Sequence, residues 1–380
     1  MRDSLLLLMT PGMSLEKWDS VGQLSREINY YEELSKKSGL KLVIFSYGRH
    51  DSKYDLPGIV VLTMPAWIPL KIPYRAQNFI YDISSLVIYR KFFKHIRICK
   101  TNQFSAASFG VLLKLIFRIP LVVRMGYYYS HFLPISYKRR LEERLAFKTA
   151  DLILTTSPEA TSSIRTNYNI VSEKIETIFN SINLQRFKPL NLNKEWDFIF
   201  VGRLEQQKNI PLVLEVMNRI GGKSLIIGEG SLDYLVKNAI QQNPGIAWLN
   251  RVDNVELPTY YSKSKCFLLL SNYEGNPKVL LEAMACGILC IGSDAPGIRE
   301  CINHNVNGIL VQKEIDNIVI TIQKLFLNQS KVVEICKNGV SWTTTNCEYS
   351  KNIDKELSFY SKLPGILKGY SSTVYKSFTE

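Results

Sequence analysis

The chain has 380 residues, enough for two domains of ordinary size, and its 46% hydrophobic and 21% charged residues are usual for a globular protein. No run of about 18 apolar residues occurs, so the sequence predicts no membrane-spanning helix. The formal net charge of +13 favours anionic partners, but no nucleic-acid-reading module is recognisable, and we expect no nucleic-acid ligand.

The first half of the chain alternates strand-like and helix-like segments. Short apolar runs predict buried strands at Leu5–Met9, Leu42–Ser46, Ile59–Thr63, Leu121–Arg124, Leu152–Thr155 and Ile175–Phe179. Longer stretches between them predict helices at Gln23–Ser38, Phe104–Phe117, Tyr137–Thr149 and Pro158–Asn167. Alternation of this kind is typical of a parallel, doubly wound α/β sheet.

Positive charge is concentrated in one part of this half. Between Arg90 and Lys148 only Glu142 and Glu143 are acidic. The basic residues there are Arg90, Lys91, Lys94, Arg97, Lys100, Lys114, Arg118, Arg124, Lys138, Arg139, Arg140, Arg144 and Lys148. Such a segment suits an anionic membrane or a phosphorylated acceptor, and the alternative is a solvated basic face.

A second series of strand-like runs follows, again with helices between them. These runs are Phe198–Val201, Leu225–Ile227, Ile246–Leu249, Phe267–Leu270, Ile288–Ile291 and Ile309–Val311. Two series predict two Rossmann-like domains that face each other, with the crevice between them as the default ligand site. We expect an N-terminal domain at residues 1–185, a C-terminal domain at 186–345, and a helical tail at 346–380.

The stretch Ser271–Gly287 carries the most specific signal in the chain. It lies between two apolar runs and predicts a polar loop followed by a helix, with Pro277 in the first turn and Gly287 as the stop. Glu282 lies within this apolar helix, where a carboxylate needs hydrogen-bond donors such as a ribose diol. Glu274 lies in the loop, within reach of a ligand. The free N–H groups of the helix N-terminus suit a diphosphate.

The context of the two glutamates resembles the donor-site signature of family 4 glycosyltransferases. Glu274 and Glu282 are separated by seven residues, with Gly-x-Pro after the first and Glu-Ala-Met-Ala-x-Gly around the second. That family consists of retaining enzymes of the GT-B fold, which use nucleotide sugars and whose C-terminal tail often crosses back to the first domain. The resemblance implies that Glu282 binds the donor and that Glu274 contacts the donor sugar and stabilises charge at its anomeric carbon. Asn276, Lys278 and Val279 are then expected at the donor as well. The alternative is a buried helix with an incidental, locally paired Glu282.

Three further segments of the second half match the family pattern. Gly202-Arg203-Leu204, followed by Lys208-Asn209, places two cations around a strand-to-helix turn, where they can bind and stabilise a leaving diphosphate. The turn that ends at Gly230 resembles the family's Gly-x-Gly turn near the nucleotide. Val252 ends the segment with which members of the family contact the base. We expect no dinucleotide fingerprint, because Asp233 stands where the third glycine would be. Asn180–Pro189 and Ala295–Glu300 are interpreted as structural.

The first half carries weaker candidates. Gly12 follows the first strand, where a glycine lets the backbone approach a ligand, and we expect it to contact the donor. Gly126 is followed by three tyrosines, of which Tyr127 is our candidate for stacking on the acceptor sugar. His131 could serve as a base or orient the acceptor, although a single histidine is more often structural. Lys100–Gln103 is a comparable polar edge.

The seven cysteines predict a reducing compartment. Their number is odd, no Cys-x-x-Cys pair occurs, and Cys266, Cys286 and Cys290 lie within apolar segments. The run Leu5–Met9 is too short for a signal peptide. We therefore expect a cytoplasmic protein with at most a peripheral contact at the inner face of the membrane.

Together these patterns predict a retaining transferase that moves a sugar from a UDP- or GDP-sugar to a growing glycan or a polyprenyl-phosphate-linked acceptor. The front-face mechanism proposed for such enzymes lets the leaving phosphate take the acceptor proton, so neither a cofactor nor a metal is expected. A nucleotide-sugar epimerase of the same fold would turn over donor without acceptor. A catalytically silent scaffold is the third possibility, although the four residues Arg203, Lys208, Glu274 and Glu282 together speak against it.

Overall fold

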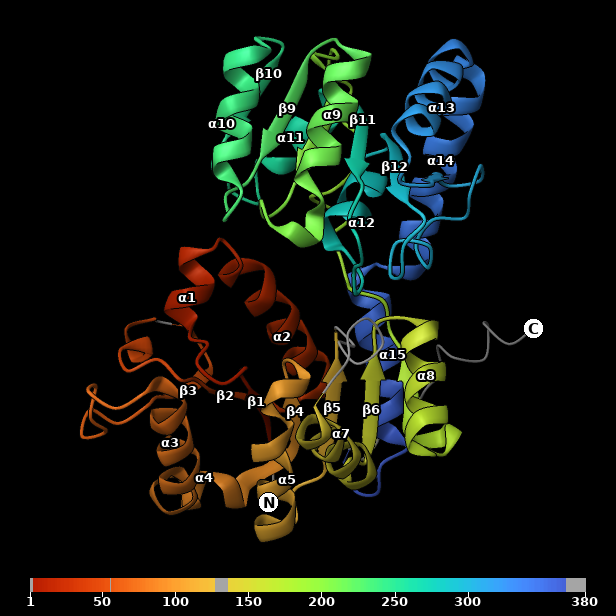
Figure 1. Ribbon diagram of the computed structural model, residues 1–380. Coiled ribbons are helices and arrows are strands. Elements are labelled where there is room, and N and C mark those ends of the chain that lie inside the picture. Colours follow the sequence, from red (N-terminus) through yellow and green to blue (C-terminus); the bar gives the residue numbers. More distant parts are fainter. Residues whose placement is uncertain (1–2, 55, 127–135, 367–380) are drawn as a thin grey trace. The chain divides into compact units, whose positions relative to one another are not determined.

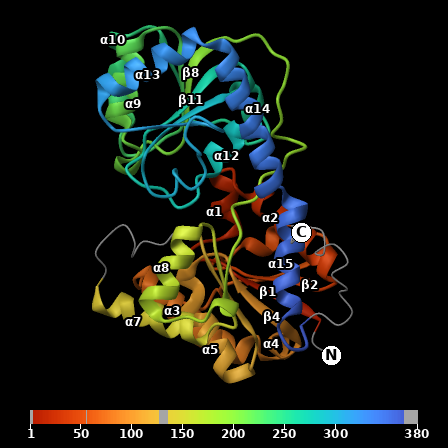
Figure 2. The same cartoon turned by 90° about the vertical axis from the view of Figure 1, so that its right-hand side faces the viewer.

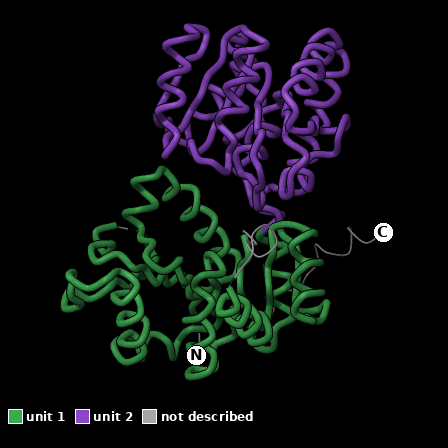
Figure 3. Tube along the Cα trace, in the orientation of Figure 1, with its two compact units in different colours: residues 1–178, 353–380 green, residues 179–352 purple. Residues whose placement is uncertain are grey.

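The computed structural model describes residues 3–54, 56–126 and 136–366, and the chain divides into two compact units (Figures 1 and 3). Unit 1 consists of residues 1–178 and 353–380, and unit 2 of residues 179–352. The units divide after Ile178 and Asn352, whereas the sequence placed the boundaries after residues 185 and 345. The segment that follows Ile178 belongs to unit 2 because the Ile182 N–H donates to the Cys347 carbonyl, at 2.7 Å, and Phe187 enters the core of that unit.

Unit 1 contains a seven-stranded sheet in the order β3-β2-β1-β4-β5-β6-β7, in which every neighbouring pair is parallel. Its strands are β1 (Ser4–Leu8), β2 (Lys41–Phe45), β3 (Ile59–Leu62), β4 (Ile96–Thr101), β5 (Leu121–Met125), β6 (Leu152–Thr155) and β7 (Ile175–Thr177). Six of these strands were predicted. The central strand β4 was missed, because Arg97 and Lys100 make its sequence look solvent-exposed, whereas Lys100 is in fact buried.

Helices lie between the strands of unit 1 (Figure 1). They are α1 (Leu15–Ser20), α2 (Leu24–Ser38), α3 (Tyr74–Ile88), α4 (Arg90–His95), α5 (Ala107–Phe117), α7 (Tyr137–Thr149) and α8 (Pro158–Tyr168), with short 3-10 turns η1 (Asp51–Lys53), η2 (Phe104–Ala106) and η3 (Ser172–Lys174). The start of α8 shows why the local sequence is helical. The Ser157 hydroxyl accepts the Ala160 N–H at 3.1 Å, and Pro158 occupies the first turn, where its missing N–H costs nothing.

Unit 2 contains a six-stranded parallel sheet in the order β10-β9-β8-β11-β12-β13. Its strands are β8 (Trp196–Val201), β9 (Ser224–Ile227), β10 (Ile246–Leu249), β11 (Ser264–Leu269), β12 (Leu289–Ser293) and β13 (Ile309–Val311). Its helices are α9 (Ile210–Ile220), α10 (Asp233–Gln242), α11 (Leu257–Ser262), α12 (Lys278–Ala285), α13 (Ile315–Leu327) and α14 (Gln329–Asn346), with the turn η4 (Gln206–Lys208). All six predicted strands are present.

Both faces of the unit 2 sheet are covered by helices. Ile199 and Val201 of β8 join one apolar cluster with residues of α11 and α12, whereas Phe198 and Phe200 join the opposite cluster with residues of α9, α10 and α13. Successive side chains of a strand point to opposite faces, so the nearly unbroken apolar run of β8 is explained by burial on both sides. The two-sheet, doubly wound architecture predicted from the sequence is therefore confirmed.

The C-terminal tail packs against unit 1, as the sequence resemblance implied. Its helix α15 spans Tyr349–Ser361, and the part from Ile353 onward belongs to unit 1. Asp354 forms an ion pair with Lys37 at 2.8 Å, and Lys355 Nζ donates to the Thr177 carbonyl at 2.9 Å. Glu356 is fully buried, and its carboxylate binds Lys100 Nζ at 2.5 Å. These contacts tie the tail to strands β4 and β7 and to helix α2.

Candidate functional site

The carboxyl edge of the unit 2 sheet brings together loops that are far apart in sequence. Strands β8, β9, β11 and β12 are neighbours and parallel, so the loops that follow them leave the sheet at one edge. The central contact is an ion pair between Lys208, after β8, and Glu274, after β11, with Nζ and Oε1 2.6 Å apart. The two side chains are 11% and 7% exposed. The sequence predicted that Arg203 and Lys208 converge on an anion, but it did not predict this pairing with Glu274.

Neighbouring polar groups orient the Glu274 carboxylate. The Ser271 hydroxyl donates to Oε1 at 2.6 Å, and Gln207 Nε2 lies 3.4 Å from Oε2. Gln207 also donates to the Tyr273 carbonyl at 3.0 Å, which ties the loop after β8 to the loop after β11. A nearly buried carboxylate is costly unless donors meet it, and here three side chains do so. The carboxylate of Glu274 and the ammonium of Lys208 therefore lie side by side at the carboxyl edge of the unit 2 sheet.

A glycine positions the backbone of Glu274. Gly297 has a φ of +77°, and a Cβ there would lie 2.2 Å from the Glu274 carbonyl oxygen. The Glu274 N–H donates to the Pro296 carbonyl at 3.0 Å. The turn Ala295–Gly297, interpreted from the sequence as structural, thus supports the candidate catalytic loop directly. Any side chain at Gly297 would force the loop of Glu274 to move.

The loops after β8 and β9 are also in direct backbone contact. A Cβ at Gly228 would lie 1.9 Å from the Gly202 carbonyl oxygen, and one at Gly230 would lie 2.5 Å from the Leu204 carbonyl oxygen. The Gly230 N–H, a candidate for donor binding, donates to Asp233 Oδ1 at 2.6 Å. Arg203 lies in the same pair of loops and is exposed. Close backbone packing therefore fixes this corner of the site, and Arg203 projects from it.

Glu282 lies inside α12, as predicted, and is 1% exposed. Asn254 Nδ2 lies 3.4 Å from Glu282 Oε1, and Asn254 Oδ1 accepts a hydrogen bond from Arg186 at 2.9 Å. The sequence did not single out Asn254, because an asparagine in a loop gives no signal of a partner 28 residues away. The half-buried Val252 lies just before it. The structure therefore contains local pairing of Glu282, which was the alternative considered from the sequence.

The remaining donor candidates of unit 2 lie at the start of α12. Asn276 is buried, and its Oδ1 accepts the Asn180 N–H at 2.7 Å while its Nδ2 lies 3.2 Å from Cys301 Sγ. Its side chain therefore already serves to hold the segment entering unit 2. Pro277 precedes the helix rather than lying in its first turn, so Lys278 and Val279 form the first turn, and both are half-buried. The first N–H groups of a helix have no intrahelical acceptor, so this end retains donors for an anion.

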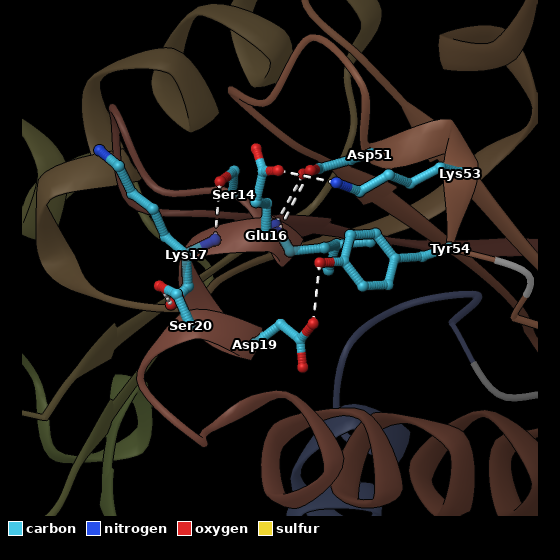
Figure 4. A network of polar contacts seen from close by, with 9 residues as sticks. Ser14, Glu16, Lys17, Asp19, Ser20, Asp51, Lys53 and Tyr54 are labelled. Atoms are coloured by element: carbon cyan, nitrogen blue, oxygen red, sulfur yellow. Dashed lines mark hydrogen bonds and ion pairs between the residues drawn. The ribbon is translucent and has the colours of Figure 1, made fainter. Parts of the chain in front are cut away.

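In unit 1, Gly12 precedes helix α1, and Asp51 binds the N-terminus of that helix (Figure 4). Gly12 has a φ of +81°, and its carbonyl accepts Lys17 Nζ at 2.6 Å. The buried Asp51 carboxylate accepts the N–H groups of Leu15 and Glu16 at 2.6 and 3.3 Å, and also the hydroxyl of Ser46. Asp51 thereby satisfies the N-terminus of α1 in the same way as a cap. Two candidates for acceptor binding, Tyr127 and His131, lie outside the described residues.

Helix α3 places polar groups beside the same loop. A Cβ at Gly12 would lie 3.4 Å from Asn78 Nδ2, and Asp82, one turn further along α3, accepts the Tyr47 hydroxyl at 2.7 Å. Burial raises the pKa of Asp82 to about 7, against the lowering effect of the hydrogen bond from Tyr47. The sequence did not identify either residue, because the helix itself was not predicted.

The substitution Asp82→Asn should stabilise the protein at alkaline but not at acidic pH. The pKa of Asp82 in the folded state lies above the ordinary value of 3.8. The contribution of Asp82 to the stability of the wild type is therefore greatest below pH 3.8 and is lost as the pH rises through about 7. Asparagine can still accept the Tyr47 hydroxyl and carries no charge. We expect a gain of about 1–3 kcal/mol at pH 8 that vanishes near pH 4, measured by urea unfolding. An equal effect at both pH values would contradict the assignment.

The described residues were compared with the needs of a metal site, a membrane span and a disulfide. Within residues 3–54, 56–126 and 136–366, no three His, Cys, Asp or Glu side chains gather as a metal ion would need. In those residues no helix combines the length and the apolar composition needed to cross a bilayer. All seven cysteines are free, and Cys336 alone among them is not fully buried.

Two protein-family models match consecutive parts of the chain. The model described as Glycosyltransferase Family 4 matches residues 29–186, and the model described as Glycosyl transferases group 1 matches residues 181–342. A curated relative from Campylobacter jejuni is N-acetylgalactosamine-N,N'-diacetylbacillosaminyl-diphospho-undecaprenol 4-alpha-N-acetylgalactosaminyltransferase. It is 28% identical over 208 residues, which cover 51% of this chain and 55% of the relative. The chain spans about half the length of these curated relatives that it matches.

Solved structures share the complete fold. Sucrose-phosphate synthase from Thermosynechococcus elongatus superposes with a TM-score of 0.79 at 18% identity, covering 94% of this chain and 98% of that one. Anabaena Alr3699/HepE, solved in complex with UDP and glucose, superposes with a TM-score of 0.74 at 16% identity, covering 95% and 100%. The predicted GT-B fold class is thus confirmed. Because the two family models together extend from residue 29 to residue 342, the chain belongs to the family 4, group 1 glycosyltransferases.

Proposed function

We propose that the protein is a retaining glycosyltransferase that transfers a sugar from a UDP- or GDP-sugar to a growing glycan or a polyprenyl-phosphate-linked acceptor. The observation that carries this proposal is the nearly buried Lys208–Glu274 pair, at the same sheet edge as Glu282. The family membership supports transfer, the relative that acts on a diphospho-undecaprenol-linked substrate supports a lipid-linked acceptor, and the UDP complex of a structural neighbour supports a nucleotide sugar.

In this proposal the donor diphosphate binds at Lys208, Arg203 and the N-terminus of α12. As the bond to the sugar breaks, the diphosphate gains negative charge, and cations aimed at it stabilise the transition state more than the ground state. Glu274 is paired with Lys208. In the proposal its carboxylate stabilises the positive charge that develops at the anomeric carbon of the donor sugar. The leaving phosphate takes the proton of the acceptor hydroxyl, so the proposal needs no metal, no other cofactor and no separate protein base.

The nucleoside is assigned to the adjoining residues. Glu282, held by Asn254, accepts the two ribose hydroxyls, and Gly230 and Val252 lie beside the base. Lys278 and Val279 contribute backbone N–H groups to the diphosphate, whereas Asn276 acts by holding the loop. The backbone of Gly12, in unit 1, is also proposed to contact the donor. We further propose that the protein works in the cytoplasm at the inner face of the membrane, where a lipid-linked acceptor would be found.

The test is thermal stability with UDP, GDP, ADP and TDP, measured on the wild type, Glu282→Ala and Glu282→Gln. One nucleotide at about a hundred times its Kd should add roughly 2.7 kcal/mol of stability to the wild type, which is visible as a rise in Tm. Removing the carboxylate that receives the ribose should weaken binding by about 1–3 kcal/mol in both variants. The glutamine variant controls for the cavity left by alanine.

Two outcomes would contradict the assignment. Equal nucleotide affinity in the wild type and both variants would leave Glu282 with a structural role only. Consumption of a nucleotide sugar at the same rate with and without acceptor, yielding an isomerised donor, would favour the epimerase over the transferase.

A further inference from the structure

Helix α3 of unit 1 carries its apolar side chains on the outside. The residues buried by the helix are Asn78, Tyr81 and Ser85, whereas Phe79, Ile83 and Val87 are 67%, 44% and 78% exposed. The three exposed residues are four apart and therefore form one stripe along the helix. A surface helix of a water-soluble domain has the opposite arrangement, with its apolar stripe against the core.

Contacts on the inner face show that this orientation is specified. The Tyr81 ring stacks on Phe45 of β2 at 4.4 Å between centroids, and its hydroxyl donates to the Leu62 carbonyl at 3.0 Å. Asp82, the next residue, accepts the hydroxyl of Tyr47 at 2.7 Å. Turning the helix to bury Phe79 would break these contacts. The outward apolar stripe is therefore built into the fold.

The stripe continues onto neighbouring elements. Helix α4 follows α3, exposes Phe92, and packs against α5 through Phe93 and Phe117, whose rings lie 5.4 Å apart. Figures 1 and 2 show α3, α4 and α5 side by side along one side of unit 1. The loop before α3, which accepts hydrogen bonds from Gln77, adds the exposed Trp67 and Leu70. We call Trp67, Leu70, Phe79, Ile83, Val87 and Phe92 the α3 patch.

The exposed charges on the segment of chain that carries the α3 patch have one sign. From Leu56 to Leu141 the sequence contains a single acidic residue, Asp82, and its side chain is turned toward Tyr47. Cations flank the patch and are all exposed, namely Lys71, Arg75, Arg90, Lys91 and Lys94. A surface that combines apolar and cationic side chains without carboxylates is complementary to anionic headgroups above an apolar layer. Tryptophan is also favoured at such an interface.

We infer that the α3 patch and its five flanking cations form a docking surface for an anionic phospholipid leaflet. A second copy of this chain fits the surface less well, because two such faces would bring ten cations together with no carboxylate between them. The cluster Lys138–Arg140 on α7 fits less well too, because Arg139 is bound to Glu143 at 3.3 Å and lies over the Phe104 ring at 4.4 Å. The inference does not depend on the proposed activity, since it concerns binding alone.

The test is co-sedimentation of the full chain with vesicles of phosphatidylcholine, with and without an equal amount of phosphatidylglycerol. The wild type should bind the anionic vesicles and not the neutral ones, and added salt should weaken the binding. Phe79→Gln/Ile83→Gln/Val87→Gln should lower the partition coefficient at least about tenfold, because the apolar stripe no longer enters the leaflet. These residues are exposed, so the variant should keep the Tm of the wild type.

Matched controls separate the patch from general charge and hydrophobicity. Leu327→Gln/Val333→Gln removes exposed apolar residues from unit 2 and should bind as the wild type does. Arg90→Gln/Lys91→Gln/Lys94→Gln should weaken binding more than Lys138→Gln/Arg140→Gln/Arg144→Gln, which removes the same charge from α7. Failure of the wild type to bind anionic vesicles, or unchanged binding by the stripe variant, would overturn the inference. So would a wild-type dimer in sedimentation that the stripe substitutions convert to a monomer without changing vesicle binding.

Discussion

Replacing Glu274 by glutamine should lower kcat by more than about tenfold, equivalent to about 1.4 kcal/mol of transition-state stabilisation, while nucleotide affinity is preserved or raised. Glutamine keeps the size and can still accept the Ser271 hydroxyl, but it removes the charge proposed to face the anomeric carbon. The Lys208 ammonium, 2.6 Å from the carboxylate in the wild type, then loses its internal partner and becomes more available to the diphosphate. The measurement is steady-state transfer kinetics together with a direct Kd for the nucleotide.

Lys208→Met is the matched partner of this variant. It should reduce both kcat and nucleotide affinity, because Lys208 is proposed to contact the diphosphate before and during transfer. The effects of Glu274→Gln and Lys208→Met should not add in the double variant, since the two groups form one buried pair. Loss of nucleotide affinity in Glu274→Gln as large as that in Glu282→Ala would refute the separate roles proposed for the two glutamates.

Glu356→Ala should destabilise unit 1 by about 3–5 kcal/mol, the usual cost of leaving one member of a buried ion pair without its partner. Lys100 and Glu356 are both 0% exposed, and Tyr30 and Tyr360 donate their hydroxyls to the same carboxylate. Burial alone would raise the pKa of Glu356, but Lys100 and the two hydroxyls outweigh it and hold that pKa below its ordinary value. The removal therefore leaves a buried ammonium close to the rings of Tyr30 and Tyr31.

The measurement is urea unfolding followed by the fluorescence of the unit 1 tryptophans, the buried Trp18 and the exposed Trp67. Fluorescence from the tryptophans of unit 2 is removed by substitution in both proteins compared. The double variant Lys100→Met/Glu356→Leu is the control, and it should be markedly more stable than Glu356→Ala because no charge remains buried. A double variant as unstable as the single one would assign the loss to packing instead of to the charge.

The pH dependence of Glu356→Ala provides a second check. In the wild type, burial lowers the pKa of Lys100 to about 8, although Glu356 raises it. Without Glu356 that folded-state pKa falls further below the value of the unfolded chain, so the unfolded state binds more protons. Stability of the variant should therefore rise as the pH increases toward about 10. A flat profile would show that Lys100 reaches solvent once Glu356 is gone.

Much of this architecture follows from short-range patterns in the sequence. Apolar runs of strand length located all six strands of unit 2 and six of the seven in unit 1, because a strand buried on both faces is apolar throughout. The stretch from Ser271 to Gly287 likewise placed Glu274 in a loop and Glu282 within a helix. Such features depend on neighbours along one element, and periodicity reports those neighbours directly.

Contacts between distant elements were beyond that reasoning. Strand β4 went unrecognised because Lys100 looks like a surface residue until Glu356, 256 positions away, neutralises it. The pairing of Lys208 with Glu274 depends on β8 and β11 being neighbours in the sheet, an order that no local pattern encodes. The outward apolar stripe of α3 was hidden for the same reason, since the chain alone does not say which face of a helix meets the core. Local sequence specifies what each segment becomes, whereas the order of strands and the partners of buried charges arise from folding the whole chain.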